Sequence, residues 1–362
     1  MLNSNIWCII MAGGTGTRFW PVSRQEKPKQ FVNIAGLGRS FLRNTFLRFE
    51  NLIPPERTIV ITSGKYRHMV HEELPELPET NILSEPYKRD TAPCIAYAMY
   101  SVLRRDPNAV MVVVPSDHLI LGQENFEHVI GAAVRFATRN DVLMTIGIQP
   151  TRPDSNYGYI QGVSLPQEGT PVAVKTFTEK PDMELARVFV QSGEFLWNSG
   201  IFVWRADMIR REIEKYMPEL ATQFRGWEGA LGSSMEEEFI EKAYAECQKV
   251  SIDYGVMEKT SSAWVYPADF TWFDVGTWES LYSMIPDKDG SGNAANVPMM
   301  VQDSSNNMML CMDKKDKLFA VCGLDDYAIV DTEQVLLICP KDDRRFRDFM
   351  SNLAMPQFEK YR

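Results

Sequence analysis

The sequence predicts an α/β protein with a doubly wound, mixed but mainly parallel sheet and a small β-rich appendage at its C-terminal end. Two observations lead to this class. Between residues 6 and 148, short runs rich in Val and Ile alternate with longer amphipathic segments, a pattern typical of buried strands and the helices that cover them. Further along, a turn-rich stretch at 287–298 precedes a few short apolar runs. We therefore expect two domains, at residues 1–288 and 289–362.

Five short apolar runs in the first half predict strands. They lack strict alternation of apolar and polar residues, which indicates that both faces of the sheet are covered. The predicted strands are residues 7–12, 58–62, 81–86, 109–117 and 142–148. Helices are predicted between them, after Ser40, after Thr91 and over 125–137, and Ser40 and Thr91 are suitable capping residues.

The pattern changes after Thr151. Residues 157–165 and 171–181 alternate apolar and polar side chains, as exposed antiparallel strands do. Helices are predicted at about 182–191, 206–217 and 235–247, and the sheet resumes at 264–278. The C-terminal part is predicted to contain strands at 318–324, 327–332 and 335–340 and a helix near 342–354.

Composition and charge exclude several classes of protein. The chain has 362 residues, of which 44% are apolar, and a net charge of -10, so it lacks the broad basic face of a general nucleic-acid binder. Its N-terminus has no signal-peptide pattern, and no apolar run approaches the roughly 20 residues that span a bilayer. Six cysteines are scattered singly, without metal or redox spacing. We therefore expect a cytoplasmic protein that binds neither nucleic acid nor a membrane.

The stretch MAGGTGTRFWPVSRQEKPKQF, residues 11–31, follows the first predicted strand. Glycines after a strand let backbone N–H groups face an anion. A dinucleotide-binding motif fails because Phe19 stands where a third glycine is needed, and an ATPase or GTPase loop fails because FWP stands where Gly-Lys-Ser/Thr is required. What remains, Gly-Gly-x-Gly-Thr-Arg with Arg18 and Lys29 eleven residues apart, suits a triphosphate or a pyrophosphate leaving group. The alternative is a glycine turn with solvated charges.

Two aspartates are candidate metal ligands. Asp117 follows the buried run VVVPS and Asp274 ends TWFD, so each lies at the carboxyl end of a predicted strand. Open α/β sheets bind ligands at this edge, and two such carboxylates can share one Mg²⁺ together with substrate phosphates. Alternatively, each aspartate caps a helix or forms a turn. We interpret His68, His71 and His118 as structural or surface residues, because no nucleophile or third metal ligand accompanies them.

Several polar residues interrupt apolar sequence. Glu179 and Lys180 stand in TFTEKPD, just before a proline. Asn198 lies between aromatic residues in FLWNSGIFVW, and Gly158 separates two tyrosines. Sugars are bound by aromatic surfaces that carry a few fixed polar groups, so these residues are candidates for a sugar site. Each is equally compatible with an ordinary turn.

Nine motifs in the same order resemble the mannose-1-phosphate guanylyltransferases, a branch of the sugar nucleotidyltransferases. They cover roughly residues 5–285, and they are GGTGTRFWPVSR, KPKQF, EPYKRDTAPC, VVPSDH, GIQPTRPDSNYGYI, FTEKPD, FLWNSGIFVW, SIDYGVMEK and WFDVGTW. Of these, FWPVSR with PKQF and LWNSG point to the mannose branch rather than to the glucose or N-acetylglucosamine relatives.

The resemblance implies a Rossmann-like nucleotidyltransferase fold and a C-terminal β-helix-like appendage that supports a homodimer. It implies transfer of GMP from GTP to α-D-mannose 1-phosphate, with Mg²⁺ as cofactor. Catalytic roles fall on Arg18, Lys29 and the two metal-binding residues Asp117 and Asp274. The implied nucleotide-binding residues are Gly13, Gly14, Gly16, Thr17, Glu85, Thr91 and Pro93. The implied sugar-phosphate-binding residues are Gly158, Glu179, Lys180 and Asn198.

The chain departs from the family pattern at two places. Asp90 stands where the family has Asn, which puts a negative charge near the nucleotide, and DSNYGY replaces the more usual ETGYGY. The sequence ends at Arg362, too soon to hold the isomerase domain of some relatives, so we expect a single activity. Two alternatives stay open. One is a nucleotidyltransferase for another base or sugar, such as glucose 1-phosphate, and the other is a non-catalytic regulatory subunit that binds sugar nucleotides.

Overall fold

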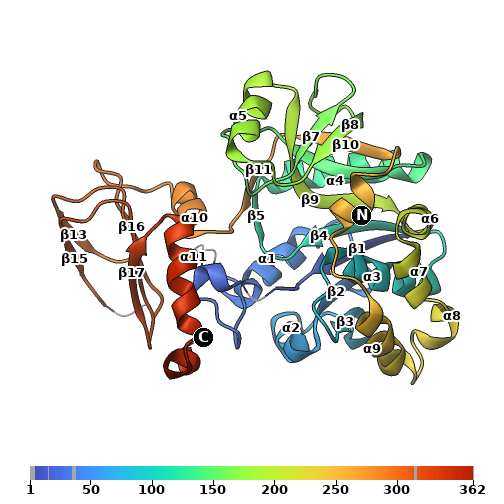
Figure 1. Ribbon diagram of the computed structural model, residues 1–362, viewed down its shortest axis with the longest axis horizontal. Helices are drawn as coiled ribbons and strands as arrows, with labels where there is room; N and C mark the ends of the chain where they lie inside the picture. Colours follow the sequence, from blue (N-terminus) through green and yellow to red (C-terminus); the bar gives the residue numbers. More distant parts are fainter. Residues whose placement is uncertain (1–4, 15, 35–37, 314–315, 362) are drawn as a thin grey trace. The chain divides into compact units, whose positions relative to one another are not determined.

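The computed structural model describes residues 5–14, 16–34, 38–313 and 316–361, and its contacts divide the chain into two units (Figure 1). The first unit consists of the chain up to Gly13 together with Leu42–Trp272. The second consists of Gly14–Phe41 together with the chain from Phe273 onward. Most of the predicted phosphate-binding loop therefore belongs to the same unit as the C-terminal strands. These units do not follow the predicted division at residue 288, which remains a proposal about the two domains.

Within the described residues, the first unit is built on a nine-stranded sheet in the order β3-β2-β1-β4-β9-β6-β10-β8-β7. The strands are β1 (Ile6–Met11), β2 (Thr58–Ser63), β3 (Ile82–Glu85), β4 (Val110–Pro115), β6 (Leu143–Ile148), β7 (Tyr159–Gly162), β8 (Val172–Thr178), β9 (Phe195–Arg205) and β10 (Ala263–Ala268). Strands β3, β2, β1 and β4 are parallel neighbours, and β6 is parallel to β10. The pairs made by β9, β8 and β7 are antiparallel.

The apolar runs of the first half form the buried strands. β1, β2 and β4 are buried along nearly their whole length, and every residue of β6 is buried. The five strands predicted between residues 7 and 148 are thereby confirmed. A strand whose side chains are covered on both faces has no reason to alternate apolar and polar residues.

Strand β9 is an element that the sequence analysis did not predict. It lies in the middle of the sheet, between β4 and β6, and is antiparallel to both. Asn198, Ser199 and Gly200 interrupt its apolar residues, so neither alternation nor a continuous apolar run marks it as a strand. The neighbouring strands on both sides supply the hydrogen bonds and the burial that stabilise it.

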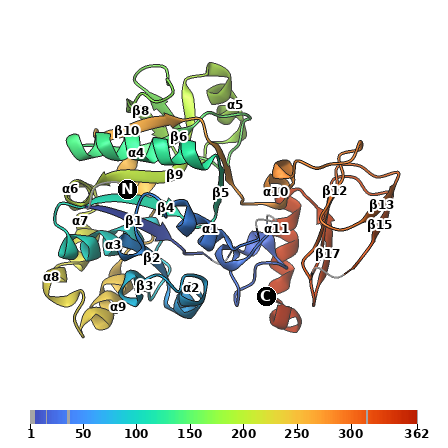
Figure 2. The same ribbon diagram turned by 180° about the vertical axis from the view of Figure 1, so that it is seen from behind.

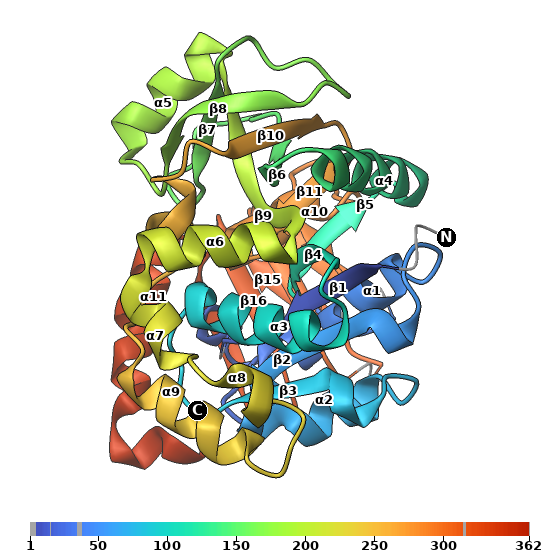
Figure 3. The same cartoon turned by 90° about the vertical axis from the view of Figure 1, so that its right-hand side faces the viewer.

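Helices pack on the sheet of the first unit. Figure 3 shows α3 and α6 side by side, and α4 packs on β4, β6, β9 and β10 (Figure 2). The helices are α1 (Phe41–Arg48), α2 (Arg67–Glu73), α3 (Thr91–Arg105), α4 (Gln123–Arg139), α5 (Met183–Ser192), α6 (Ala206–Tyr216), α7 (Pro218–Gln223), α8 (Trp227–Ala230) and α9 (Glu236–Glu246). In the described part of the chain, no helix has both the length and the apolar character that a membrane crossing requires.

The helix predicted after Thr91 is confirmed, but Thr91 does not cap it. Asp90 is the capping residue, and its Oδ1 accepts a hydrogen bond from the backbone N–H of Thr91 at 2.9 Å. Asp90 adopts a φ of 71° and a ψ of −171°, a backbone conformation that strongly favours glycine. The Asp90 side chain therefore has a local structural role, which an asparagine oxygen could fill equally well.

The second unit contains short strands that pair mostly in parallel. Two fully buried asparagines connect successive strands, because Asn307 Nδ2 donates to Asn293 Oδ1 at 3.0 Å and Asn307 Oδ1 accepts from Tyr327 N at 2.9 Å. β12 pairs with β14, β14 with β16 and β13 with β15, all in parallel, whereas β17 is antiparallel to β16. Their bounds, with those of α10 and α11, are β12 (Ala294–Ala295), β13 (Met299–Gln302), β14 (Met308–Cys311), β15 (Phe319–Cys322), β16 (Tyr327–Asp331), β17 (Leu336–Pro340), α10 (Trp278–Met284) and α11 (Asp343–Ser351).

A glycine in β6 positions β9. The register between β6 and β9 shifts between Thr145 and Gly147, and Gly147 stands opposite Asn198. A Cβ atom on Gly147 would lie 2.5 Å from Val265 Cγ2 and 2.7 Å from Leu196 Cδ1. Only glycine therefore leaves room for the two neighbouring strands at this point.

Replacing Gly147 with alanine should lower the free energy of unfolding by about 1–3 kcal/mol, because the added methyl group overpacks the core. Urea unfolding followed by circular dichroism measures the change. Gly229→Ala is the matched control, since a Cβ there would meet no atom within 4 Å. If both variants unfolded at the same urea concentration, the close packing at Gly147 would make no measurable contribution to the free energy of unfolding.

Candidate active site

The predicted sugar-phosphate residues lie together in the first unit. A Cβ atom on Gly158 would collide with Glu179 Oε2 and would lie 3.2 Å from Asn198 Cβ. The carbonyl oxygen of Gly158 accepts a hydrogen bond from Asn198 N at 2.8 Å. Lys180 completes the group through an ion pair with Glu179 Oε1. Residues from a loop, the end of β8 and the middle of β9 therefore form one polar cluster, which we call the sugar-side cluster.

Glu179 has an unsatisfied oxygen within this cluster. Its side chain is only 8% exposed, and among the described residues Oε2 has no hydrogen-bond partner. An orphaned buried acceptor costs about 1–3 kcal/mol, so such an atom commonly marks the place where a ligand donates a hydrogen bond. Lys180 is 60% exposed and adopts a φ of 49°. Burial lowers the pKa of Lys180, but the charge and hydrogen bond of Glu179, together with Asp253 and Tyr254, outweigh this effect, and the net pKa is raised.

Asp253 joins the sugar-side cluster, and the sequence analysis did not single it out. Its Oδ1 accepts a hydrogen bond from Asn198 Nδ2 at 2.9 Å. Asn198 Oδ1 accepts from Thr145 Oγ1 at 3.0 Å and from Gly200 N at 3.1 Å, so the Asn198 amide has a defined orientation. Burial and the nearby charge of Glu179 raise the pKa of Asp253, and the Asn198 hydrogen bond opposes this rise. The acid stands in the motif SIDYGVMEK, but no local pattern indicates that it reaches Asn198.

Glu85 and Gly13 meet at the predicted nucleoside side of the first unit. Glu85 ends β3, and a Cβ atom on Gly13 would lie 3.8 Å from Glu85 Oε2. Tyr244 donates its hydroxyl hydrogen to Glu85 Oε1 at 3.0 Å. Burial raises the pKa of Glu85 to about 7, the Tyr244 hydrogen bond lowers it, and the neighbouring charge of Asp90 raises it further. Glu85 is therefore a carboxyl that changes its charge near neutral pH.

Thr91 and Pro93 lie in the first turn of α3. Thr91 connects the predicted nucleoside side to the segment that leads to Asp253 in the sugar-side cluster. Its Oγ1 accepts a hydrogen bond from Ile252 N at 2.9 Å, and the next residue, Ala92, donates its N–H to Val250 O at 3.1 Å. The segment that precedes Asp253 is thus attached to the start of α3. Pro93 is buried there and contributes no backbone donor.

In the second unit, the glycine-rich loop packs directly on Lys29. A Cβ atom on Gly16, whose φ is 61°, would lie 2.9 Å from Lys29 N. The Lys29 side chain is almost completely buried, and its Nζ lies 5.5 Å from the ring centre of Phe19 and 5.2 Å from that of Phe41. Gly14 O accepts a weak hydrogen bond from Gln30 Nε2 at 3.3 Å, a contact that sequence reasoning missed. The loop and the predicted phosphate-binding lysine therefore form one packed structure.

Arg18 and Asp274 approach the same place in the second unit. A Cβ atom on Gly276 would lie 3.6 Å from both carboxylate oxygens of Asp274 and 3.8 Å from Arg18 Nη1. Arg18 is exposed, and it stands in the short helical turn Thr17–Phe19. Asp274 is the last residue of β11 (Thr271–Asp274). The side chain of Thr17, a predicted nucleotide contact, lies outside the described part of the structure.

Asp117 belongs to the first unit, where it follows β4. Its side chain is 38% exposed, and Asp117 Oδ1 lies 4.0 Å from His118 Nε2. His118 Nδ1 accepts a hydrogen bond from Trp272 Nε1 at 3.2 Å, which is a structural role. Because Asp117 and Asp274 belong to different units, their sharing of one Mg²⁺ stays a prediction.

Comparison with known proteins places the chain in a family. The model of the nucleotidyl transferase family matches residues 7–289. Mannose-1-phosphate guanylyltransferase of Escherichia coli is 36% identical, in an alignment that covers 98% of this chain and 76% of that protein. Xanthan biosynthesis protein XanB of Xanthomonas campestris pv. campestris is 37% identical over 94% of this chain and 71% of its own length.

A solved structure from Thermus thermophilus, described as a mannose-1-phosphate geranyltransferase, superimposes with a TM-score of 0.85. It is 28% identical and covers 97% of this chain and 100% of its own. The expected α/β nucleotidyltransferase fold and the resemblance to mannose-1-phosphate guanylyltransferases are thereby confirmed. On this similarity, the chain belongs to the nucleotidyl transferase family.

Proposed function

We propose that the chain transfers GMP from GTP to α-D-mannose 1-phosphate and releases GDP-mannose and pyrophosphate. The observation that carries this proposal is the sugar-side cluster, in which Gly158, Glu179, Lys180 and Asn198 meet around a buried carboxylate oxygen that has no partner among the described residues. Its support is the similarity, at 36% identity, to a protein named mannose-1-phosphate guanylyltransferase. The phosphate loop with Arg18 and Lys29 supplies the cations that a triphosphate requires.

The reaction is an in-line attack by a phosphate oxygen of the sugar phosphate on the α-phosphorus of GTP. The new P–O bond forms as the bond to the β-phosphate bridging oxygen breaks, and that oxygen leaves with pyrophosphate. A phosphate monoester has a second pKa of about 6, so the nucleophile is already an anion at neutral pH and needs no general base. Catalysis then consists of positioning and charge neutralisation.

Each group of residues has a defined part in this proposal. Lys180 binds the phosphate of the sugar substrate, and the orphaned Oε2 of Glu179 accepts a hydrogen bond from a sugar hydroxyl. Asp253 accepts a hydrogen bond from the side-chain amide of Asn198. This bond fixes the orientation of the amide and therefore the direction of its second N–H hydrogen. Arg18 and Lys29 neutralise the triphosphate, where negative charge grows as pyrophosphate departs.

Asp117 and Asp274 are the proposed magnesium ligands. Their donor chemistry fits, because Mg²⁺ prefers carboxylate oxygens and both side chains are partly exposed at the end of a strand. When bound, the ion supplies positive charge to phosphate oxygens. Asp274 and Arg18 both lie close to Gly276. This arrangement supports a site there for a phosphate and its counterion.

We also propose the finer architecture that the resemblance implies. A doubly wound domain at 1–288, whose sheet is mixed rather than mainly parallel, would carry a β-helix-like appendage at 289–362. The parallel pairs β12–β14–β16 and β13–β15 support this appendage. The appendage would join two copies into a homodimer. The six free cysteines support a reducing compartment such as the cytoplasm.

Pyrophosphate release tests the proposed reaction. The purified chain should release pyrophosphate only when Mg²⁺, GTP and mannose 1-phosphate are all present, and omission of any one should abolish release. The same assay with ATP, CTP and UTP, and with glucose 1-phosphate, measures selectivity. If pyrophosphate were released only with another nucleotide or another sugar phosphate, the assigned fold would stand and the assigned substrates would change. Tight GDP-mannose binding without any turnover would favour a regulatory subunit.

Replacing Lys29 with methionine should lower kcat by about 10²- to 10³-fold, because the charge that stabilises the transition state is lost. Methionine keeps the apolar stem between Phe19 and Phe41, so the melting temperature should change little. The exposed Lys27, changed to methionine in the same way, is the matched control and should retain its kcat. Near-normal turnover of Lys29→Met would refute the role of Lys29.

Replacing Gly158 with alanine should displace Glu179 Oε2 from the sugar-side cluster. We expect kcat/KM for mannose 1-phosphate to fall on the order of 10- to 100-fold, while the KM for GTP stays near its original value. Steady-state kinetics with each substrate varied in turn separate the two effects. Gly229→Ala is the control, because its new methyl group has free space. An equal loss for both substrates would indicate general distortion rather than a sugar site.

A further inference from the structure

The carbonyl oxygen of Gly16, in the glycine-rich loop, is held from inside the second unit. It accepts one hydrogen bond from the hydroxyl of Ser23 and another from Phe19 N at 3.1 Å. Ser23 is completely buried. A buried side chain seven residues further along the chain therefore attaches the loop to the protein interior.

A closed turn fixes the position of the Ser23 hydroxyl. The backbone N–H groups of Val22 and Ser23 both donate to Phe19 O, at 2.8 Å and 3.0 Å. Because Phe19 N donates in turn to Gly16 O, the chain from Gly16 to Ser23 folds back on itself. The hydroxyl therefore reaches Gly16 from a backbone that has its own hydrogen bonds.

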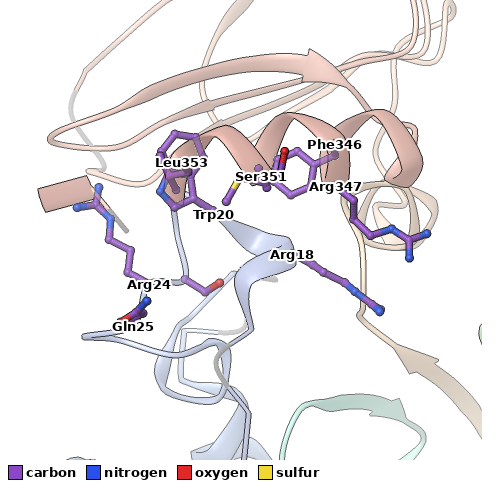
Figure 4. Close-up of a pocket in the computed structure, with 10 residues that line it drawn as sticks. Arg18, Trp20, Arg24, Gln25, Phe346, Arg347, Ser351 and Leu353 are labelled. Carbon is purple, nitrogen blue, oxygen red and sulfur yellow. The ribbon is translucent and has the colours of Figure 1, made fainter. Parts of the chain in front are cut away.

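Trp20 anchors this turn to the C-terminal part of the second unit. Its Nε1 donates to Tyr361 O at 2.6 Å, and its ring lies 6.5 Å from that of Phe349 on α11. Figure 4 shows Trp20 against α11, at a pocket of about 290 Å³ that Ser23 also lines, whereas Arg18 extends away from Trp20. Trp20 is buried and Arg18 is exposed, so the two side chains leave the turn in different directions.

The hydrogen bond to Gly16 O also sets the direction of the next backbone N–H group. A trans peptide unit is planar, and its C=O and N–H bonds point in opposite directions. Since Gly16 O points toward Ser23, the N–H of Thr17 points away from Ser23. Gly16 is packed on Lys29 as well, because a Cβ atom on Gly16 would lie 2.9 Å from Lys29 N. This peptide is therefore held by its neighbours before any ligand binds.

We propose that Ser23 is a positioning residue for the phosphate loop, whose hydroxyl holds the peptide between Gly16 and Thr17 so that its N–H group faces the triphosphate of the nucleotide. This inference rests on the proposed function, which assigns the triphosphate to the glycine-rich loop with Arg18 and Lys29. A backbone donor that already has the right direction costs no reorganisation when the anion binds. Ser23 does not touch the nucleotide and acts through the carbonyl of Gly16.

Binding of GTP to the full chain tests this inference. In isothermal titration calorimetry with Mg²⁺, Ser23→Ala should bind GTP about three- to tenfold more weakly than the unchanged protein, as expected for one lost hydrogen bond. Ser304→Ala is the matched control, because Ser304 is buried in the same unit and its hydroxyl donates to another backbone carbonyl, Gln302 O, at 2.9 Å. It should keep the GTP affinity of the unchanged protein. Equal GTP affinities of the two variants would overturn the inference.

Kinetics distinguish a positioned loop from a general loss of structure. Ser23→Ala should raise the KM for GTP by about three- to tenfold and leave the KM for mannose 1-phosphate unchanged. Ser23→Thr keeps the hydroxyl and should restore part of the loss. An equal rise of both KM values in Ser23→Ala would indicate general distortion and would contradict the positioning role.

Ser23→Cys keeps the test valid if Ser23→Ala does not fold, because a thiol is close in size and is a weaker donor. It should shift the GTP affinity in the same direction by a smaller factor. A chain that binds GTP but makes no GDP-mannose would refute the proposed function, and the affinities of the variants would still decide the role of Ser23. Absence of GTP binding by the unchanged protein would refute both.

Discussion

The hydrogen bonds of the Asn198 amide are the interaction on which the sugar-side cluster depends. They connect β9 to β6 through Thr145 and to the turn that begins at Asp253. That turn is attached in addition to the start of α3, through Thr91. Hydrogen bonds therefore connect the central antiparallel strand, the sugar-side cluster and the predicted nucleoside side within the first unit. A change in the position of Asn198 would therefore alter the hydrogen bonds to Thr145 and Asp253.

Each unit carries charge in a form that suits the proposed chemistry. The first unit holds partly buried carboxyls, Glu85 and Asp253, whose pKa values burial raises, so they are less charged at neutral pH than ordinary carboxyls. The second holds Arg18 and Lys29, in and after the glycine-rich loop. In a chain with a net charge of -10, this local excess of cations is the feature that a polyphosphate would recognise.

Glycine acts in both units by leaving space. At Gly158 a side chain would occupy the position of Glu179 Oε2, and at Gly16 it would overlap Lys29. In both places, a residue with a charged side chain lies where a Cβ atom would otherwise be. The glycines of the motifs therefore shape the surroundings of Glu179 and Lys29 as directly as the charged residues do.

Local pattern alone was sufficient for the strands from residue 7 to residue 148 and for the family, because apolar runs and motifs are properties of neighbouring residues. It was not sufficient for β9, whose interrupted apolar residues form a strand only when β4 and β6 bind both of its edges. Nor did it indicate the capping role of Asp90 or the contact of Asp253 with Asn198, 55 residues away. The contact between Trp20 and Phe349 also depends on segments far apart in the sequence. Such contacts are decided by the tertiary fold, since burial and hydrogen-bond partners exist only after distant segments have packed.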